Sequence, residues 1–265
     1  MSRRCLYAAL LFCALSVIGC DEGSVPADDW GEAHARLQTL GESNLDDPEE
    51  IAFALDRLKN GSAGERVVAA WALGAIRHAE AEPALREALD DKDMNVRANA
   101  IGAMFALAPA DWPEIVALGL ADPELFVQQS TLSKMPDLTP AELIAPIGAL
   151  LTGSGDEIVR AGAADALGKA NGTDEAVRAL GRGVTDESKE VRSHIAFALG
   201  KAENSNAVSL LSKLLDDESW EVRANACQAL GHYRTPEAIE ALGRALEDPN
   251  AQVRAIAQRS ADRGS

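Results

Sequence analysis

Aromatic residues are scarce in this chain. Phe, Trp and Tyr together make up 4% of its 265 residues, although 47% of the residues are hydrophobic. Ala and Leu fill many of the apolar positions, and both favour helices, whereas strands favour aromatic and β-branched residues. The composition therefore argues against a sheet protein and favours an all-α fold of closely packed helices.

Positive charge is also in short supply. The chain has 25 Lys and Arg residues against 42 Asp and Glu residues, which gives a formal net charge of −17. A chain of this charge is repelled by phosphate backbones and by anionic lipid headgroups within about a Debye length, roughly 8–10 Å. The charge therefore argues against nucleic acid as a partner.

The apolar run at the N-terminus is too short to be a good membrane anchor. It extends from Cys5 to Ile18, broken only by Ser16, and it follows the basic pair Arg3 and Arg4. A spanning helix needs roughly 20 apolar residues. A basic start and a short apolar core are typical of a signal peptide, which we expect over residues 1–19.

The end of this leader resembles a bacterial lipobox, because Val17, Ile18 and Gly19 precede Cys20. The resemblance implies cleavage after Gly19 and lipid attachment at the Cys20 thiol. It also implies a bacterial cell-envelope protein that is anchored to a membrane and faces the periplasm or the cell exterior. The only membrane contact would be the anchor, held by about 0.8 kcal/mol per buried CH₂. An ordinary secretory signal with a nearby cysteine is the alternative reading.

Little cysteine remains once the leader is removed. Cys5 and Cys13 leave with it, Cys20 is acylated, and Cys227 is left without an internal partner. The mature protein would therefore be stabilised by packing and not by disulfides. Cys227 lies in a helical register, where we expect a buried small residue and not a nucleophile. Loss of the two leader arginines brings the net charge to −19.

From residue 61 onward the sequence repeats itself, with a period of about 31–32 positions. The repeats are marked by an arginine column in which Gln128 replaces one member; the arginines are Arg66, Arg97, Arg160, Arg192, Arg223 and Arg254. Apolar or small residues at positions −1, +3 and +7 from this column share one face of a helix and form a buried stripe. Glycine follows the stripe in four repeats and is interpreted as a helix stop. These glycines are Gly74, Gly168, Gly200 and Gly231.

A second helix follows within each repeat. In one of them, Thr235, Pro236 and Glu237 supply a cap residue, a proline at the first helical position and an early acidic residue. The buried stripe of this helix is predicted to consist of Ile239, Leu242 and Leu246. Neither helix can bury its stripe alone, and stacking of neighbouring helix pairs solves that problem.

The repeat pattern therefore predicts an α-solenoid of stacked, antiparallel helix pairs over residues 61–265. Residues 20–29 are expected to form the acylated cysteine and a polar linker. Residues 30–60 keep helical periodicity without the repeat motif, so we expect a divergent N-terminal helix pair that acts as a cap. The last segment, residues 251–265, is polar and is expected to cap the other end.

An aspartate stands six residues before the column in five repeats, and Asn60 and Ser154 are the exceptions. The aspartates are Asp91, Asp122, Asp186, Asp217 and Asp248. Together with Val-Arg and Ala-Leu-Gly, they resemble HEAT repeats of the short, phycobilisome-lyase-like type over residues 61–265. The resemblance implies that these aspartates and the column arginines form a structural ladder along the turns. We expect each carboxylate to accept helix-start amides and an arginine fork, and Arg192 to serve Asp186 or its turn.

No catalytic, metal or cofactor site is predicted. The four histidines, His34, His78, His194 and His232, occupy different places in the repeat. Deoxyhypusine hydroxylases resemble the chain in its repeats, but they bind iron through His-Glu dyads, and no such dyad occurs here. Bilin lyases share the repeat only, and DNA glycosylases of this class need a basic groove. An enzyme or enzyme subunit of the lyase or hydroxylase kind is the alternative to a protein-binding scaffold.

The partner is predicted to bind on the concave face. In HEAT-like solenoids the second helices of the repeats are expected to line that face, and one outward column there is apolar in the middle and basic toward the C-terminus. Such a ridge suits a protein partner that is acidic and has an apolar anchor. The predicted ridge consists of Trp112, Leu118, Leu150, Arg178, Arg182, Lys213 and Arg244. Alternatively, Leu118 and Leu150 are core residues and Arg244 pairs locally with Glu240.

Overall fold

The computed structural model describes residues 31–43, 47–108 and 110–264. The expected signal peptide, Cys20 and the linker over residues 20–29 lie outside the described residues. Within the described ranges the chain forms 15 α-helices, one short 3-10 turn at Ala79–Ala81, and no strand. None of the described helices is long and apolar enough to cross a bilayer. The prediction of an all-α solenoid is confirmed.

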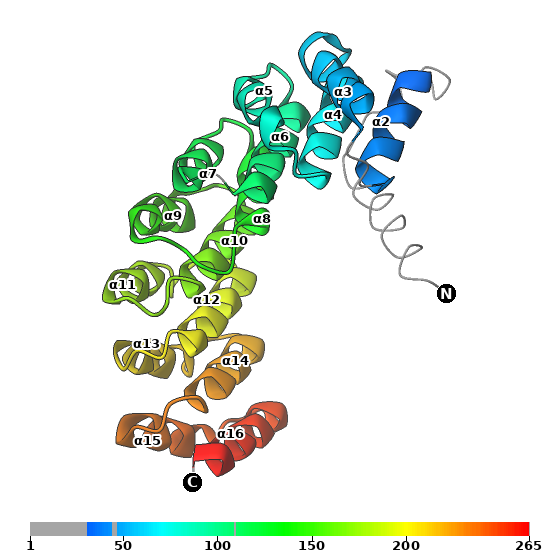
Figure 1. The fold of residues 1–265 in the computed structure, drawn as a ribbon. Coiled ribbons are helices and arrows are strands. Elements are labelled where there is room, and N and C mark those ends of the chain that lie inside the picture. The colour runs from blue at the N-terminus through cyan, green and yellow to red at the C-terminus, as the bar shows by residue number, and fades with distance from the viewer. Residues whose placement is uncertain (1–30, 44–46, 109, 265) are drawn as a thin grey trace, which may run out of the picture.

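The helices form two rows that alternate along the chain (Figure 1). One row consists of α3 (Pro48–Asn60), α5 (Glu82–Ala88), α7 (Trp112–Leu120), α9 (Ala141–Gly153), α11 (Asp174–Arg182), α13 (Asn206–Leu214) and α15 (Pro236–Ala245). The other consists of α2 (Glu32–Ser43), α4 (Ala63–Ala75), α6 (Met94–Leu107), α8 (Leu125–Lys134), α10 (Glu157–Gly168), α12 (Lys189–Lys201), α14 (Trp220–Leu230) and α16 (Ala251–Gly264). The alternation includes the expected N-terminal pair, because α2 packs on α4 and α3 packs on both α4 and α5.

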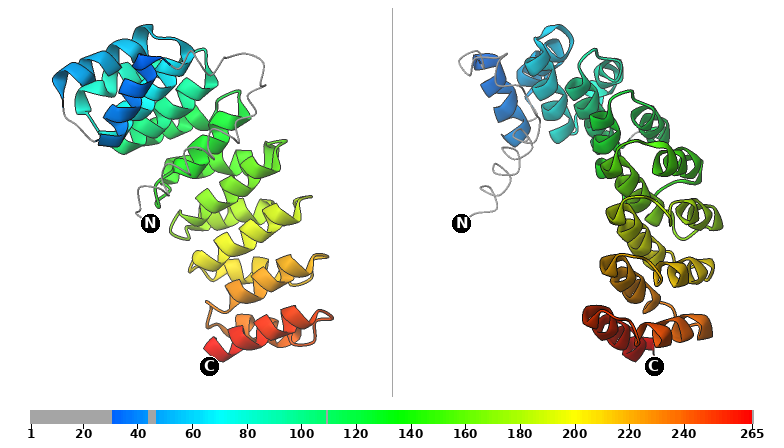
Figure 2. Two further views of the ribbon diagram at one scale, coloured as in Figure 1. Left: turned by 90° about the vertical axis from the view of Figure 1, so that its right-hand side faces the viewer. Right: turned by 180° about the vertical axis from the view of Figure 1, so that it is seen from behind.

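The stack of helices is curved, and the arginine-bearing helices line its inner side (Figures 1 and 2). We call α2, α4 and the following even-numbered helices the inner row, and the odd-numbered helices the outer row. The prediction that the second helices of the repeats line the concave face is therefore wrong. The predicted ridge lies on α7, α9, α11, α13 and α15, which form the outer, convex side.

Close contacts between inner helices explain this curvature. A Cβ atom added at Gly74 in α4 would lie 2.6 Å from the Cα and Cβ atoms of Ala103 in α6, and one at Gly200 would lie 3.0 Å from the Cα atom of Ala229. Gly168 meets Ala198 in the same way. Glycine facing alanine lets two helices approach closely. The inner row is thereby drawn together, and the stack bends toward it.

The repeated glycines act as packing contacts, and they also stand at or next to the helix ends, as the helix-stop interpretation predicted: Gly231 is the C-cap of α14 and Gly168 is the last residue of α10. None of the four stops its helix by adopting a left-handed conformation. Among the described glycines only Gly172 has a positive φ. The left-handed residues are instead non-glycine residues that stand eleven positions after the arginine column. They are Arg77, Ala108, Asn171 and Glu203. Only Asn171, followed by Gly172, marked this turn in the sequence, because the residues at the other three positions, Arg77, Ala108 and Glu203, rarely adopt a left-handed conformation.

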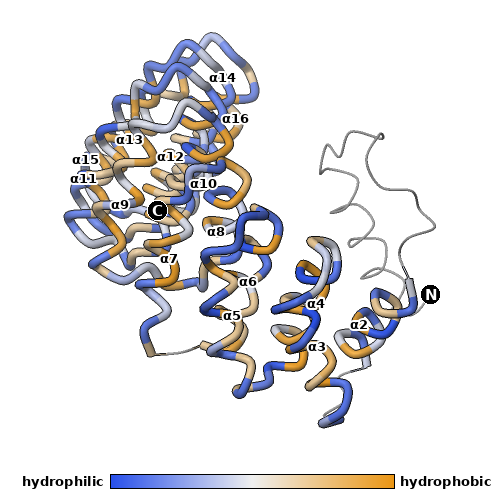
Figure 3. Tube along the Cα trace, turned by 90° about the horizontal axis from the view of Figure 1, so that it is seen from above, coloured by the Kyte–Doolittle hydropathy of each residue, from blue (hydrophilic) through white to orange (hydrophobic). Residues whose placement is uncertain are grey.

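The core lies between the two rows, where the helices bury small and aliphatic side chains. Figure 3 shows hydrophobic and hydrophilic segments alternating along the helices, as expected when one face of each helix is buried. In α15 the Thr235 hydroxyl accepts a hydrogen bond from the Ala238 amide, and Pro236 begins the helix, as predicted. Leu242 is buried, but Ile239 is more than half exposed, so its assignment to the buried stripe is wrong.

Candidate protein-binding surface

The structural ladder connects each repeat to the next one. In every complete rung, Nε and Nη2 of the arginine donate to the two carboxylate oxygens of an aspartate in the following repeat, at distances of 2.6–3.0 Å. The pairs are Arg66–Asp91, Arg97–Asp122, Arg160–Asp186, Arg192–Asp217 and Arg223–Asp248. The remaining guanidinium nitrogen, Nη1, donates to a main-chain carbonyl of the preceding turn. Each arginine thus braces two successive turns.

This geometry corrects the expected pairing within a rung. Arg192 was expected to serve Asp186, but its fork binds Asp217, and it reaches Asp186 only through the main-chain carbonyl, at 2.7 Å. The Asp186 carboxylate is bound by Arg160 and also accepts the Ser188 amide at 2.9 Å. The expected combination of an arginine fork and a helix-start amide is confirmed. In the last complete rung, the hydrogen bond from Arg223 lowers the pKa of the Asp248 carboxyl.

One rung is missing, and both of its members are replaced together. Gln128 occupies the arginine position, and Ser154 occupies the aspartate position of the following repeat. Gln128 keeps only the main-chain bond, donating to the Asp122 carbonyl at 2.7 Å. Gln128 and Ser154, which depart from the repeat pattern in successive repeats, are therefore the two members of one lost ion pair. Arg254, in the last helix, likewise bonds only main-chain carbonyls, those of Asp248 and Pro249.

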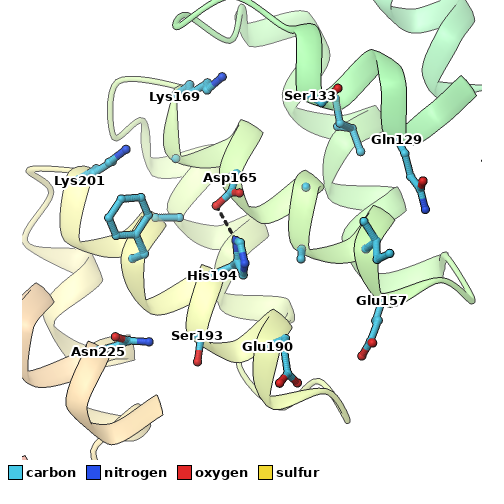
Figure 4. Close-up of a pocket in the computed structure, with 17 residues that line it drawn as sticks. Gln129, Ser133, Glu157, Asp165, Lys169, Glu190, Ser193, His194, Lys201 and Asn225 are labelled. Carbon is cyan, nitrogen blue, oxygen red and sulfur yellow. Dashed lines mark hydrogen bonds and ion pairs between the residues drawn. The ribbon is translucent and has the colours of Figure 1, made fainter. Parts of the chain in front are cut away.

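A different feature of the inner face is an open groove of about 790 Å³ that crosses α8, α10, α12 and α14 (Figure 4). Two large apolar side chains in it face solvent: Ile158 in the first turn of α10 is 63% exposed, and Phe197 in α12 is 52% exposed. Small residues lie between them, among them Ala161 and Gly162. Exposed large apolar residues gathered in a concave surface are typical of an interaction site.

Charged residues line opposite edges of this groove. Glu157 and Glu190 lie at the N-terminal ends of α10 and α12, and Lys169 and Lys201 lie at their C-terminal ends (Figure 4). The Lys201 Nζ atom is 4.2 Å from the centroid of the Phe197 ring, which places a cation beside an exposed aromatic face. The groove therefore has an acidic edge, a basic edge and, between them, a floor of exposed apolar and small residues that also includes His194 and Asp165.

A histidine–carboxylate pair lies between the two edges (Figure 4). The Nδ1 atom of His194 in α12 is 2.9 Å from a carboxylate oxygen of Asp165 in α10. This hydrogen bond raises the pKa of His194 above its usual value. The other three histidines lie elsewhere, and the described residues contain no group of three or more His, Cys, Asp or Glu side chains placed to hold a metal ion.

We expect Asp165→Asn to lower the pKa of His194 toward about 6.5, its ordinary value. Because the folded state raises this pKa, the pair stabilises the protein fully below the unfolded pKa, and that stabilisation is lost as pH rises through the folded pKa. The stability difference between wild type and Asp165→Asn should therefore be larger at about pH 5.5 than at about pH 8.5. NMR titration of His194 and urea denaturation at the two pH values check this. A His194 pKa that does not change in the variant would contradict it.

The predicted ridge residues do not form a comparable surface. Trp112 is half-buried, and its ring is edge-on to that of Phe105, with the ring centroids 6.5 Å apart. Leu150 packs partly against the core, in agreement with the alternative that it is a core residue. Leu118 is 59% exposed on the outer face, so the core alternative for it is wrong. Exposed cations on that face are Arg178, Arg182, Lys213 and Arg244. Within the described part of the chain, Arg244 forms no ion pair with Glu240.

The remaining cysteine behaves as expected from its register. Cys227 is fully buried in α14, and burial raises the pKa of its thiol to about 12. A thiol with this pKa is almost entirely protonated near neutral pH, and only the thiolate is nucleophilic. Cys227 is therefore a small core residue.

Comparison with known proteins identifies the repeats. A family model described as HEAT repeats matches residues 51–129 and 179–261. A search of curated proteins finds no match. Among solved structures, Kap95p in a complex with RanGDP aligns with a TM-score of 0.61 and 14% identity over 90% of this chain and 38% of its own. An engineered protein aligns with a TM-score of 0.57 and 22% identity over 91% and 75%.

A third similar structure is the CpcE and CpcF complex of phycocyanin lyase from Nostoc, with a TM-score of 0.49 and 19% identity over 81% of this chain and 94% of that chain. All three identities are low, so the likenesses concern the fold alone. The segment between the two family-model matches, residues 130–178, contains half of α8, all of α9 and α10, and the missing-rung residue Ser154. The groove thus lies partly over the least regular repeats.

Proposed function

Because the chain belongs to the HEAT-repeat family, we propose that it is a protein-binding scaffold whose inner face holds its partner. The observation that carries this proposal is the groove, where Ile158 and Phe197 expose apolar surface on the concave side. Removal of such apolar surface from water favours association. Kap95p, which is similar in fold, binds RanGDP.

The outer face supports a partner less well. Its exposed apolar residues, Leu118 and Ile239, are far apart in the stack, on α7 and α15. Its ridge cations are spread over three helices, two in α11 and one each in α13 and α15, and exposed charges of this kind contribute little to affinity. We therefore assign the partner to the groove and not to the ridge.

Photo-crosslinking in cells tests this assignment. A photoreactive residue at Phe197 should trap a discrete protein, whereas the same residue at Leu118, on the outer face and equally exposed, should not. Binding of the trapped protein to the purified scaffold should then be lost in Phe197→Asp and kept in Leu118→Asp. Trapping at Leu118 alone would refute the assignment.

We also propose that the scaffold is tethered to a membrane of the cell envelope through a lipid on Cys20. Support comes from the lipobox-like sequence over residues 17–20 and from the short apolar run before it. An unlipidated serine in place of the thiol leaves no acyl chain to bury.

Cys20→Ser should therefore abolish labelling by a fatty-acid probe and move the protein from the detergent phase to the aqueous phase. Cys227→Ser is the matched control, because that thiol is buried in the core, and it should label as the wild type does. Absence of label on the wild-type protein, or label retained in Cys20→Ser, would refute the tether.

The enzyme alternative makes a separate prediction. A lyase or hydroxylase of this fold would be isolated with a chromophore or with iron. Absorbance spectra and metal analysis of the purified protein, made in its own cells, distinguish the two functions.

A further inference from the structure

The two edges of the groove carry opposite charge, and this limits which partner segments can occupy it. Glu157 and Lys169 are twelve residues apart along α10, and Glu190 and Lys201 are eleven apart along α12. At about 1.5 Å per residue, the acidic and basic edges are roughly 16–18 Å apart. An α-helix with its side chains is about 10–12 Å wide and fits between them.

An extended strand suits this groove less well than a helix. Side chains of a strand alternate between two opposite faces, so the face that meets the groove offers a single row. The groove instead requires three rows side by side, one toward each charged edge and an apolar one toward the floor. A helix presents three such rows at once, because residues three and four apart share a face.

The two apolar anchors also match a helix. Successive inner helices pack about 8–10 Å apart, and α10 and α12 are in close contact, with Gly168 against Ala198. Ile158 and Phe197 stand two residues before and five after their column arginines, so they are also offset by about 10 Å along the helices, and a partner helix that contacts both lies oblique to the charged edges. One apolar row of a helix, with members at i, i+3, i+7 and i+10, spans about 15 Å and reaches both anchors.

We propose that the groove binds an amphipathic α-helix of the partner protein. Its apolar row contacts Ile158 and Phe197, a row of acidic residues faces Lys169 and Lys201, and a row of basic residues faces Glu157 and Glu190. The small residues Ala161 and Gly162 let the helix lie close to the floor. This inference rests on the proposed function and adds the chemical class of the partner.

Designed peptides test the inference on the full mature protein. The first is a 20-residue helix-forming peptide with one leucine row, one glutamate row and one arginine row. The second has the same composition ordered so that leucines alternate, which favours a strand. The third has glutamate in both charged rows. Fluorescence anisotropy should give saturable binding of the first peptide and about tenfold or weaker binding of the other two.

Charge reversal of the scaffold supplies the decisive comparison. Lys201 is exposed, and its ammonium group lies over the Phe197 ring without an ion pair to any described carboxylate. Lys201→Glu should weaken the first peptide several-fold and strengthen a fourth peptide that has arginine in both charged rows. Leu118→Asp on the outer face is the control and should change nothing. Circular dichroism of each variant shows that it is folded.

Three results would overturn the inference. The strand-forming peptide could bind as tightly as the helical one, Lys201→Glu could leave both helical peptides unchanged, or the protein could self-associate in a manner abolished by Phe197→Asp, which would assign the groove to a second copy. If crosslinking at Phe197 still traps a protein in any of these cases, the proposed scaffold function stands and only the helical partner is refuted. If crosslinking traps nothing, the scaffold function itself fails.

Discussion

Arg192→Ala should lower the free energy of unfolding by about 3–5 kcal/mol, the cost of removing one member of a buried ion pair. The Arg192 and Asp217 side chains are each only 7% exposed, and the fork between them has two hydrogen bonds, of 2.6 and 2.9 Å. The truncation leaves the Asp217 carboxylate buried without its cation. It also removes the donor to the Asp186 carbonyl. Urea denaturation followed by circular dichroism measures the loss.

Arg254→Ala is the matched control for this experiment. Arg254 belongs to the same column, but it is exposed and binds only main-chain carbonyls of its own turn. Its truncation should cost less than about 1 kcal/mol. Equal losses for Arg192→Ala and Arg254→Ala would mean that the fork contributes nothing and that the column is only a solvated face.

Gly74→Ala should destabilise the protein by about 1–3 kcal/mol, although alanine is normally the better helix residue. The new methyl group would lie 2.6 Å from the Cα atom of Ala103, so the main chain of α4 or α6 must shift. Because the close contact draws the inner row together, the change should also reduce the curvature. Small-angle scattering and urea denaturation measure the two effects.

Gly64→Ala in the same helix is the control. Nothing lies within 4 Å of a Cβ atom at that position, and Gly64 is exposed. There the substitution should be neutral or stabilise the protein by up to about 1 kcal/mol. If Gly74→Ala is stabilising as well, the glycine column has no packing role.

The solenoid itself could be predicted from the sequence because its period is short and its signals recur. Cap residues, the buried stripe and the arginine column all return once in every repeat, so each repeat supports the reading of the others. Which of the two rows lines the concave side was harder to predict. Both rows have stripes of the same kind, and a stripe shows which side of a helix is buried but not which row is drawn together.

The information on curvature was present in the glycine column. Gly74, Gly168 and Gly200 all lie on arginine-bearing helices, and each faces an alanine of the next inner helix. Reading these glycines as helix stops concealed their role as contacts between helices. The pairing of the ladder was also within reach, because Gln128 and Ser154 are lost together and stand in successive repeats.

The groove could not be predicted in the same way. Ile158 and Phe197 stand at different positions of the repeat, and at those positions the other repeats have residues such as Glu190, Glu221 and Gln228. Nothing periodic marks them, and only the stacking of α10 on α12 brings them to one surface. The His194–Asp165 pair is likewise formed by residues 29 positions apart on neighbouring helices.

The missing rung also affects how the protein unfolds. In a linear array each repeat is coupled only to its neighbours, so the array is as cooperative as its weakest coupling. Complete rungs connect α4, α6 and α8 in one run and α10, α12, α14 and α16 in another. No complete rung connects α8 to α10, where Gln128 and Ser154 replace the arginine and the aspartate. The ladder therefore consists of two separate runs of ion pairs, although a shared buried core and the hydrogen bond from Gln129 to Asp156 connect α8 to α10. The groove extends from Gln129 and Ser133 in α8 to α10 and α12, across the gap in the ladder, so a bound partner would strengthen the coupling between the two runs.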